Sequence, residues 1–183
     1  MLAILALFSY GTTRVRPYWV LRLYGITTKL LLRLLGNVKI EVFGDPYQIN
    51  KQPVLIIANH VSALDTIALA PILNKNNFTY VVKKSLMQWK SFPFNLGCRT
   101  SWCIPVSREA NNGDFAMMID ECKLRFGKNV SVLIFPKGTR EKELAKSADI
   151  PATGLLLAKK LKCDVLPVFF DTLNWQNGRI IKD

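Results

Sequence analysis

The stretch PVLIIANHVSALD, residues 53–65, decides the fold because it joins an apolar run to a helical pattern through a short polar turn. Residues 53–58 form a continuous apolar run of strand length, and residues 65–73 carry apolar side chains at helical spacing. The sequence therefore predicts that His60 lies at a strand-to-helix turn. In an open α/β sheet, such turns line the crevice beyond the carboxyl ends of the strands, where ligands bind.

His60 is the only histidine in the chain, and Asp65 follows it five positions later. Imidazole changes its charge near neutral pH, so any imidazole general-base chemistry in this protein must use His60. The local sequence equally fits a structural interpretation, in which Asn59 or Ser62 caps the following helix and His60 is an ordinary loop residue. The turn alone leaves both interpretations open.

Strand and helix patterns alternate along the rest of the chain, which is typical of an α/β domain. We expect a single domain over residues 38–183, with a mostly parallel mixed sheet flanked by helices, after an N-terminal segment of residues 1–37. No internal repeat or flexible linker divides this domain. The predicted strands are 38–43, 54–58, 79–82, 102–106, 130–135 and 165–170, and the predicted helices are 65–73, 85–94, 114–126 and 152–161.

Length and composition narrow the class of protein. The 183 residues suit one domain with a substantial core, and half of them are hydrophobic. The net charge of +12 indicates an anionic partner, such as an acidic lipid surface, a phosphorylated substrate or nucleic acid, although no recognised nucleic-acid motif is present. The four cysteines lack C-x-x-C spacing, and one histidine completes no zinc set. We expect reduced cysteines, no metal, no nucleic-acid partner and a cytosolic-side location.

The N-terminal segment predicts a membrane-associating helix. Residues 17–36 are long enough to span a bilayer. Burying Arg22, Lys29 and Arg33 at its centre, however, would cost about 2.5 to 3.5 kcal/mol each. Because these cations share one helical face, an interfacial helix on an anionic membrane surface is favoured, with packing against the core as the alternative. Residues 1–10 are apolar but lack the basic region and cleavage site of a signal peptide.

A second candidate site is the turn FPKGTR, residues 135–140, which follows another buried-type strand. Proline and glycine force a turn there, where backbone N–H groups, a hydroxyl and two cations can converge on an anion. Arg140 has the planar fork that binds phosphate, and Lys137 adds a point charge. Arg108 follows a third strand, so we expect Arg108, Arg140 and His60 to share one crevice. Taken alone, such a turn is more often a solvated basic loop.

Four segments together resemble the sequence blocks of the glycerolipid acyltransferases, specifically the 1-acylglycerol-3-phosphate O-acyltransferase group. Residues 59–65 are similar to the N-H-x-x-x-x-D block, 104–108 to the second block, 135–140 to F-P-E-G-T-R, and 165–168 to the hydrophobic-proline block. The blocks occur in the family's order at family-like separations. The resemblance implies acyl transfer from acyl-coenzyme A or acyl carrier protein to the sn-2 hydroxyl of 1-acylglycerol-3-phosphate, giving phosphatidic acid at the cytosolic face of a membrane.

The resemblance also implies residue roles. His60 would remove the proton of the acceptor hydroxyl, and Asp65 would hold the imidazole ring, with Asn59 and Ser62 in support. The resemblance implies neither a metal nor a bound cofactor, because the acyl thioester is a co-substrate. The residues expected to bind the glycerophosphate group of the acceptor are Arg108, Lys137, Gly138, Thr139 and Arg140.

Two departures from the family pattern leave alternatives open. Lys137 occupies the position of the usual glutamate in the third block, so no role of that carboxylate carries over. The chain also ends shortly after the fourth block, which indicates a compact or truncated member. The alternatives are an acyltransferase for another lysophospholipid or for glycerol-3-phosphate, and a catalytically silent protein that binds lysolipid at a membrane.

Overall fold

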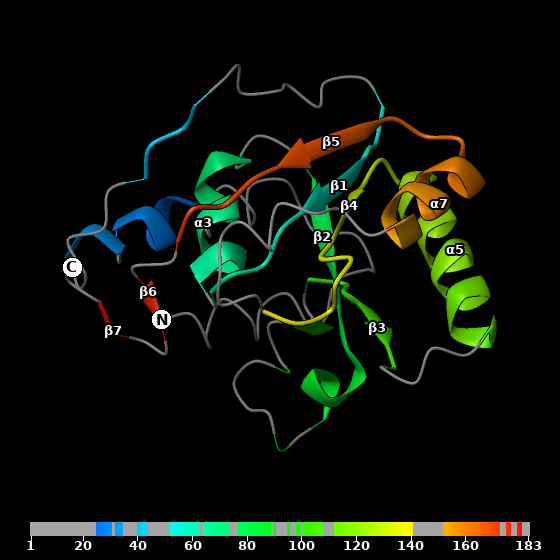
Figure 1. Cartoon of the computed structure of the whole chain (residues 1–183), viewed down its shortest axis with the longest axis horizontal. Helices are drawn as coiled ribbons and strands as arrows, with labels where there is room; N and C mark the ends of the chain where they lie inside the picture. Colours follow the sequence, from blue (N-terminus) through cyan, green and yellow to red (C-terminus); the bar gives the residue numbers. More distant parts are fainter. Residues whose placement is uncertain are drawn as a thin grey trace.

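The structure is a computed structural model of the chain. It describes residues 25–30, 32–34, 40–43, 52–62, 64–73, 77–88, 90, 95, 98–99, 101–107, 112–140, 152–172, 175–176 and 179–180. These residues form an α/β domain around one five-stranded sheet with the order β3-β2-β4-β1-β5, and Figure 1 shows the helices on its two sides. The strands of this sheet are β1 (Leu55–Ala58), β2 (Phe78–Lys83), β3 (Ile104–Val106), β4 (Ser131–Ile134) and β5 (Val165–Val168).

Helices connect these strands, so that every pairing in the five-stranded sheet is parallel. The alternation of strand and helix predicted this arrangement, but the expected mixed sheet was wrong. A separate antiparallel pair, β6 (Trp175–Gln176) and β7 (Arg179–Ile180), stands apart from the sheet. The helical elements are α3 (Leu64–Ile72), the 3-10 helix η1 (Lys84–Met87), α5 (Asn112–Phe126) and α7 (Ala152–Leu161).

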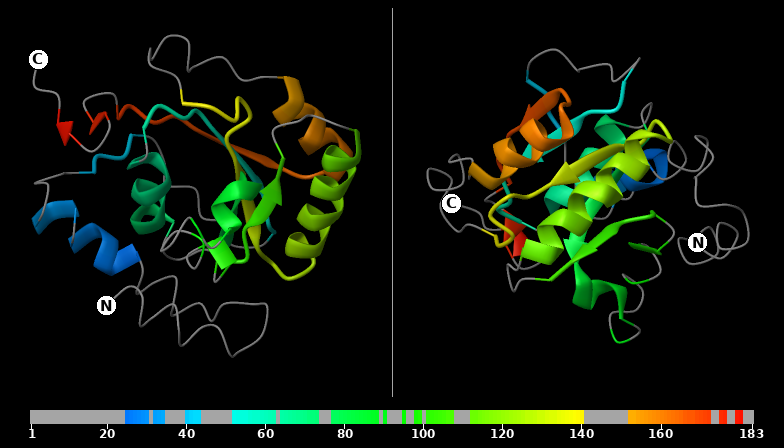
Figure 2. Two further views of the ribbon diagram at one scale, coloured as in Figure 1. Left: turned by 90° about the horizontal axis from the view of Figure 1, so that it is seen from below. Right: turned by 90° about the vertical axis from the view of Figure 1, so that its right-hand side faces the viewer.

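The core lies on both faces of the sheet, as β1 shows most clearly. Successive side chains of a strand point to opposite faces. Leu55 and Ile57 pack in the cluster under α5 and α7, whereas Ile56 and Ala58 pack in the cluster under α3. Figures 1 and 2 show α3 on one side of the sheet and α5 with α7 on the other. A strand buried on both faces reads as a continuous apolar run, which explains the pattern of residues 53–58.

The strand order places a topological switch point at the middle of the sheet. The chain leaves β1 toward β2 and β3 on one side, but it leaves β4 toward β5 on the other side. Helix α3 therefore covers one face and α7 the opposite face, and the carboxyl ends of the neighbouring strands β1 and β4 lie between them. Ligands of open α/β sheets bind at such a switch point. Both candidate segments from the sequence, residues 59–65 and 135–140, follow these two strands.

The helical turns that precede β3, β4 and β5 end in the same way. Trp102, Asn129 and Lys162 have positive φ angles of 56°, 55° and 51°. In each case the next backbone N–H bonds back to a carbonyl five residues earlier, as in Val130 N to Arg125 O at 3.0 Å. This double-bonded helix end turns the chain directly into the next strand. These compact turns lie at the edge of the sheet where the strands begin. The candidate segments after β1 and β4 lie at the opposite edge, where the strands end.

Two sequence predictions are wrong in part, and a third concerns residues that the structure describes only in part. The strand expected over residues 38–43 is wrong for 40–43, which pair with no strand; Ile40 instead packs beside the core. The helix expected over 85–94 is wrong at its start, where η1 makes one tight turn. Of the predicted helix 17–36, residues 25–30 and 32–34 are helical and the others lie outside the described residues. Among the described helices, none has the length and apolar character needed to cross a bilayer.

Candidate active site

The turn after β1 brings His60 against Asp65. The Nδ1 atom of His60 lies 2.8 Å from Oδ2 of Asp65. The side chain of His60 is 17% exposed, whereas that of Asp65 is fully buried. Asp65 is in the first turn of α3, so the five-residue spacing folds the carboxylate back beneath the imidazole. The buried acid thus contacts Nδ1 of the partly exposed imidazole, and Nε2 is the ring nitrogen that points away from the acid.

Asp65 accepts hydrogen bonds from five donors. Its Oδ2 atom receives His60 Nδ1 and the backbone N–H groups of Val61 and Ser62, at 2.8 to 2.9 Å. Its Oδ1 atom receives the hydroxyls of Ser62 and Thr172. Burial raises the pKa of this carboxyl, but these hydrogen bonds outweigh burial and hold the pKa below its ordinary value of 3.8. Asp65 is therefore a carboxylate anion near neutral pH.

Ser62 has the capping role that the sequence allowed, and it also contacts the buried acid. Its Oγ atom accepts the backbone N–H of Leu64 at 3.0 Å, which satisfies a donor at the start of α3. The same hydroxyl donates to Asp65 Oδ1 at 3.3 Å. The contact with Asp65 uses the single donor of this hydroxyl, and the cap uses one of its acceptor sites, so Ser62 supports the turn.

Asn59 joins the turn to the end of β5. Its Nδ2 atom donates to the carbonyl of Phe170 at 2.8 Å, and its Oδ1 atom accepts the Phe170 N–H at 2.6 Å. The two bonds continue the parallel pairing of β1 and β5 through a side chain. Phe170 itself is buried in the cluster under α3. Asn59 therefore supports the turn by fixing the segment that follows β5 next to it.

The second candidate segment meets His60 through Phe135. The rings of Phe135 and His60 are stacked, with centroids 4.2 Å apart and an angle of 20° between their planes. After Phe135 the chain turns, with Gly138 at φ 66° and its N–H bonded to the Phe135 carbonyl at 2.9 Å. Lys137 is half-buried, whereas Thr139 and Arg140 are exposed. The structure thus places the basic turn, residues 136–140, directly beside the histidine.

Gly154 of α7 allows this turn to lie close to the sheet. A Cβ atom at Gly154 would lie 3.4 Å from both the Ile57 side chain and the Pro136 side chain. Both contacts are tighter than most methyl contacts, so a larger residue would push α7 away from the turn. The first turn of α7 therefore sets the position of the segment after β4.

The predicted site residues have three outcomes. His60, Asp65, Asn59 and Ser62 lie together in one hydrogen-bonded group. The turn of residues 136–140 adjoins that group through the stacked rings of Phe135 and His60, and its role in binding phosphate stays a prediction. Arg108 lies outside the described residues, so its convergence with His60 stays a prediction. The site also contains Thr172, which no local pattern marked, because its contact with Asp65 depends on the position of β5 beside β1 in the sheet.

No group of three or more histidine, cysteine, aspartate or glutamate side chains suited to a metal ion occurs within the described part of the chain. All four cysteines are free thiols. Asp65 carries the one described carboxylate in contact with His60, and hydrogen bonds from the protein occupy both of its oxygens. The arrangement suits proton transfer at Nε2, the ring nitrogen that does not contact Asp65.

Comparison of the sequence with known protein families identifies one family that matches most of the chain. The sequence profile of the family described as Acyltransferase matches residues 39–171, which contain the whole five-stranded sheet and every described site residue except Thr172. The chain belongs to the acyltransferase family. The resemblance found in the four sequence blocks is therefore confirmed.

Curated acyltransferases are similar over part of their length. A putative 1-acyl-sn-glycerol-3-phosphate acyltransferase of Caenorhabditis elegans is 36% identical over 109 residues, which are 58% of this chain and 37% of that protein. A 1-acyl-sn-glycerol-3-phosphate acyltransferase of Helicobacter pylori is 30% identical over 115 residues, 62% of this chain and 46% of that protein. The matches thus span less than half the length of these curated relatives.

A solved acyltransferase structure has the same fold. The crystal structure of the 1-acyl-sn-glycerophosphate acyltransferase PlsC from Thermotoga maritima matches this chain with a TM-score of 0.69. The match covers 97% of this chain and 70% of that chain, with 20% sequence identity. The shared fold therefore extends over almost the whole of this chain.

Proposed function

We propose that this acyltransferase-family chain transfers a fatty acyl group from a thioester to the sn-2 hydroxyl of 1-acylglycerol-3-phosphate. The observation that carries the proposal is the His60–Asp65 pair with the basic turn of residues 136–140 beside it. The pair supplies a base for a hydroxyl, and the turn supplies cations for the phosphate of the same acceptor. The curated relatives named 1-acyl-sn-glycerol-3-phosphate acyltransferases support this acceptor.

His60 acts as the general base in this proposal. Its Nδ1–H donates to Asp65, which leaves Nε2 to accept the proton of the acceptor hydroxyl. The hydroxyl oxygen then forms a bond to the thioester carbonyl carbon. The tetrahedral intermediate breaks its bond to sulfur, and the leaving thiolate takes the proton from His60. Asp65 stabilises the imidazolium during this interval, as the buried acid does in hydrolase triads.

The acceptor oxygen is itself the nucleophile, so no covalent enzyme intermediate is needed. Ser62 is the hydroxyl nearest to His60 in sequence, but it caps α3 and donates to Asp65. A serine in those two interactions is not directed at a thioester held on the accessible side of the ring. The donor is an acyl-coenzyme A or an acyl carrier protein thioester, and the chain requires no cofactor for this step.

The glycerophosphate group binds at the turn after β4. The side chains of Thr139 and Arg140 are exposed, and Gly138 leaves the backbone accessible. Lys137 is half-buried and adds a second positive charge to the turn. Arg108, which follows β3 in sequence, contributes a further cation to the same crevice in this proposal.

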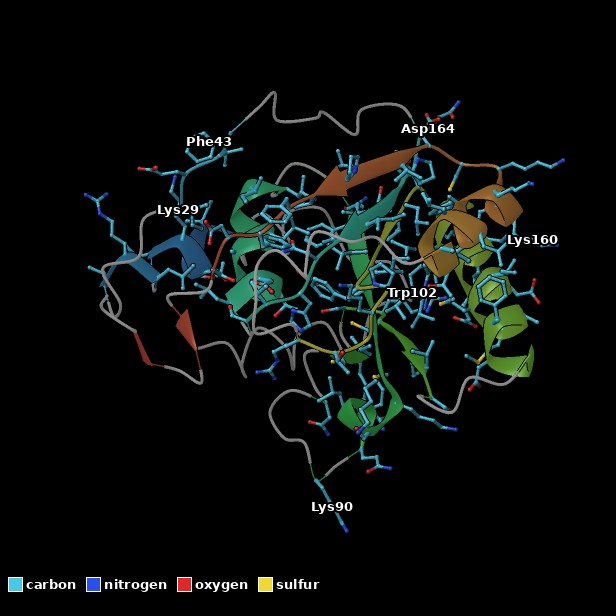
Figure 3. All side chains as sticks on the ribbon, viewed as in Figure 1. Lys29, Phe43, Lys90, Trp102, Lys160 and Asp164 are labelled. Carbon is cyan, nitrogen blue, oxygen red and sulfur yellow. The ribbon has the colours of Figure 1, made fainter. Side chains whose placement is uncertain are left out.

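Arg140→Ala is expected to raise the KM for the lysolipid acceptor about tenfold, with a smaller effect on kcat. A charge-assisted hydrogen bond to phosphate is worth about 1.5 to 3 kcal/mol when it is removed from one side. Steady-state kinetics with varied lysophosphatidate measures the change. The matched control is Lys160→Ala, an exposed cation whose side chain points outward from α7 (Figure 3), and this variant should leave KM unchanged. An effect of Arg140→Ala confined to the acyl donor would contradict the assignment.

We further propose that the helical residues 25–30 and 32–34 seat the enzyme on an anionic membrane surface. Ile26, Leu30 and Leu34 are spaced four residues apart, and they are 52%, 54% and 70% exposed. Lys29 and Arg33 are also exposed and adjoin this apolar stripe. Such a helix lies in the interface with its apolar side toward the acyl chains and its cations among the headgroups. The free cysteines support a cytosolic face.

Leu30→Glu is expected to weaken binding to vesicles of phosphatidylcholine and phosphatidylglycerol by about tenfold or more, because a buried leucine contributes about 1.5 to 3 kcal/mol. Leu155→Glu is the matched control, since Leu155 on α7 is 55% exposed and lies at the opposite end of the molecule. Vesicle co-sedimentation measures both variants. Equal loss in the two variants would contradict a specific membrane face.

The proposed function is tested by acyl transfer from labelled acyl-coenzyme A and acyl carrier protein to a panel of acceptors. The panel contains lysophosphatidate, lysophosphatidylcholine, lysophosphatidylglycerol and glycerol-3-phosphate, presented in mixed vesicles. We expect phosphatidate to form fastest, and formation to require His60. Faster acylation of another acceptor would replace the proposed acceptor, and no transfer to any acceptor would favour a silent lysolipid-binding protein.

A further inference from the structure

Thr172 contacts the acid of the proposed catalytic pair from a distant part of the chain. Its Oγ1 atom donates a hydrogen bond to Oδ1 of Asp65, across 107 residues of sequence. Among the described residues, Ser62 is the other donor to that oxygen, at 3.3 Å, and its hydroxyl also caps Leu64. A distance of 3.3 Å is long for an O–H···O bond. Thr172 is therefore the main hydrogen-bond donor to Oδ1.

The segment that carries Thr172 is held in place independently. Two residues earlier, Phe170 makes two backbone hydrogen bonds to the side chain of Asn59 and is buried in the core. Phe170 follows β5, which pairs with β1 along its full length. Because the sheet and Asn59 both fix this segment, the hydroxyl of Thr172 reaches Asp65 from a rigid support.

We propose that Thr172 is a positioning residue for acyl transfer, which holds the Asp65 carboxylate so that Oδ2 faces Nδ1 of His60. The proposal rests on the proposed function of the His60–Asp65 pair. The two oxygens of a carboxylate are rigidly linked, so a donor on Oδ1 fixes the direction of Oδ2. The backbone N–H groups of Val61 and Ser62 hold Oδ2 from one side, and Thr172 completes the restraint from the other.

Removal of the hydroxyl would act on His60 through Asp65. Without Thr172, Oδ1 keeps one long hydrogen bond from Ser62, whose hydroxyl is shared with the helix cap. The carboxylate then gains freedom to turn away from Nδ1, and the imidazole loses the partner that selects its tautomer. Thr172 contributes no charge to the acceptor site, so the loss appears in kcat while KM stays similar.

The test uses Thr172→Val, which keeps the shape and removes the donor, and Thr172→Ser, which restores the donor. We expect Thr172→Val to lower kcat about tenfold, as loss of a hydrogen bond to a charged group does, with KM for lysophosphatidate within about twofold. Thr172→Ser should retain kcat within about twofold of the native value. Equal loss in the valine and serine variants, or native kcat in the valine variant, would overturn the proposal.

A second measurement needs no activity. Because His60 is the only histidine, nitrogen-15 labelling of histidine gives the two ring signals of one residue. At neutral pH the native protein and Thr172→Ser should show one tautomer with the proton on Nδ1. Thr172→Val and Thr172→Ala should move both signals toward the average of the two tautomers. Unchanged signals in folded Thr172→Val would sink the proposal, whereas an inactive native protein with these signal changes would count against the proposed function alone.

Discussion

His60→Ala is expected to lower kcat for acyl transfer about 10³-fold, because a positioned general base contributes about 10² to 10⁴ in rate. The chain contains no second imidazole to replace it. The acceptor hydroxyl would then attack the thioester with water as the base. The KM for the acceptor should change little, since the proposed phosphate contacts lie in the turn after β4. Single-turnover and steady-state rates with labelled acyl donor measure the effect.

The variant is expected to fold. His60 is partly exposed, and its loss removes one stacking contact with Phe135 and one hydrogen bond to Asp65. Each is worth about 1 kcal/mol in the free energy of unfolding, a modest part of the stability of a domain. Urea unfolding should therefore remain cooperative. His60→Gln is the matched control for volume and polarity, and it should be as slow as His60→Ala. Retention of more than a tenth of native kcat in both would refute the base assignment.

Asp65→Asn is expected to lower kcat about 10²-fold while preserving the fold. The two backbone N–H groups of Val61 and Ser62 require an acceptor, so the amide oxygen should occupy the Oδ2 position. That orientation still accepts the His60 Nδ1–H, and the amide NH₂ faces the hydroxyls of Ser62 and Thr172, which rotate to accept. The tautomer is kept, but the negative charge that stabilises the imidazolium is lost.

Asp65→Ala is the contrasting variant, and it should unfold far more easily. It leaves buried N–H donors without an acceptor, and each such group costs about 1 to 3 kcal/mol. Measuring the free energy of unfolding for both variants separates the charge of Asp65 from its hydrogen bonds. Equal instability of the asparagine and alanine variants would show that the expected amide orientation is wrong.

Asp65 also makes the free energy of unfolding depend on pH in the acid range. The pKa of Asp65 in the folded chain is below its ordinary value of 3.8, so the unfolded chain takes up this proton first as pH falls. The stabilisation from Asp65 is therefore complete above about pH 5, and it is lost as pH falls through the lowered folded pKa. Unfolding in urea between pH 6 and about pH 2.5 should show a flatter profile for Asp65→Asn than for the native protein.

The elements with strong periodicity were predictable from sequence. The predicted helix 152–161 matches α7, and β1, β4 and β5 lie within their predicted ranges. The region around η1 could not be predicted in this way. Residues 85–94 have the apolar spacing of an α-helix, but the chain forms one 3-10 turn at the start of this range. The expected strand at 40–43 was also wrong, because an alternating pattern does not say whether a neighbouring strand is available for pairing.

The site residues also fall into a part that the sequence predicted and a part that it did not. His60 and Asp65 lie within one turn, and the resemblance to the N-H-x-x-x-x-D block implied the contact that the structure shows. The partners from other strands depend on the strand order, which the sequence does not state. Phe135 and Thr172 reach the pair only because β4 and β5 both adjoin β1. Neither their residue types nor their spacing within the chain distinguishes them from other residues at strand ends.

The pairing of β1 with β4 has a further consequence for the choice of acceptor. Ile57 stands opposite Ile134, only a few residues before His60 and the basic turn. Neighbouring strands are about 4.8 Å apart, and buried central strands do not slide against each other. The separation between the base and the cationic turn is thus a fixed length. In the proposed function an acceptor must match that length between its hydroxyl and its anionic group, so we expect headgroups with a longer spacer to be rejected by distance rather than by charge.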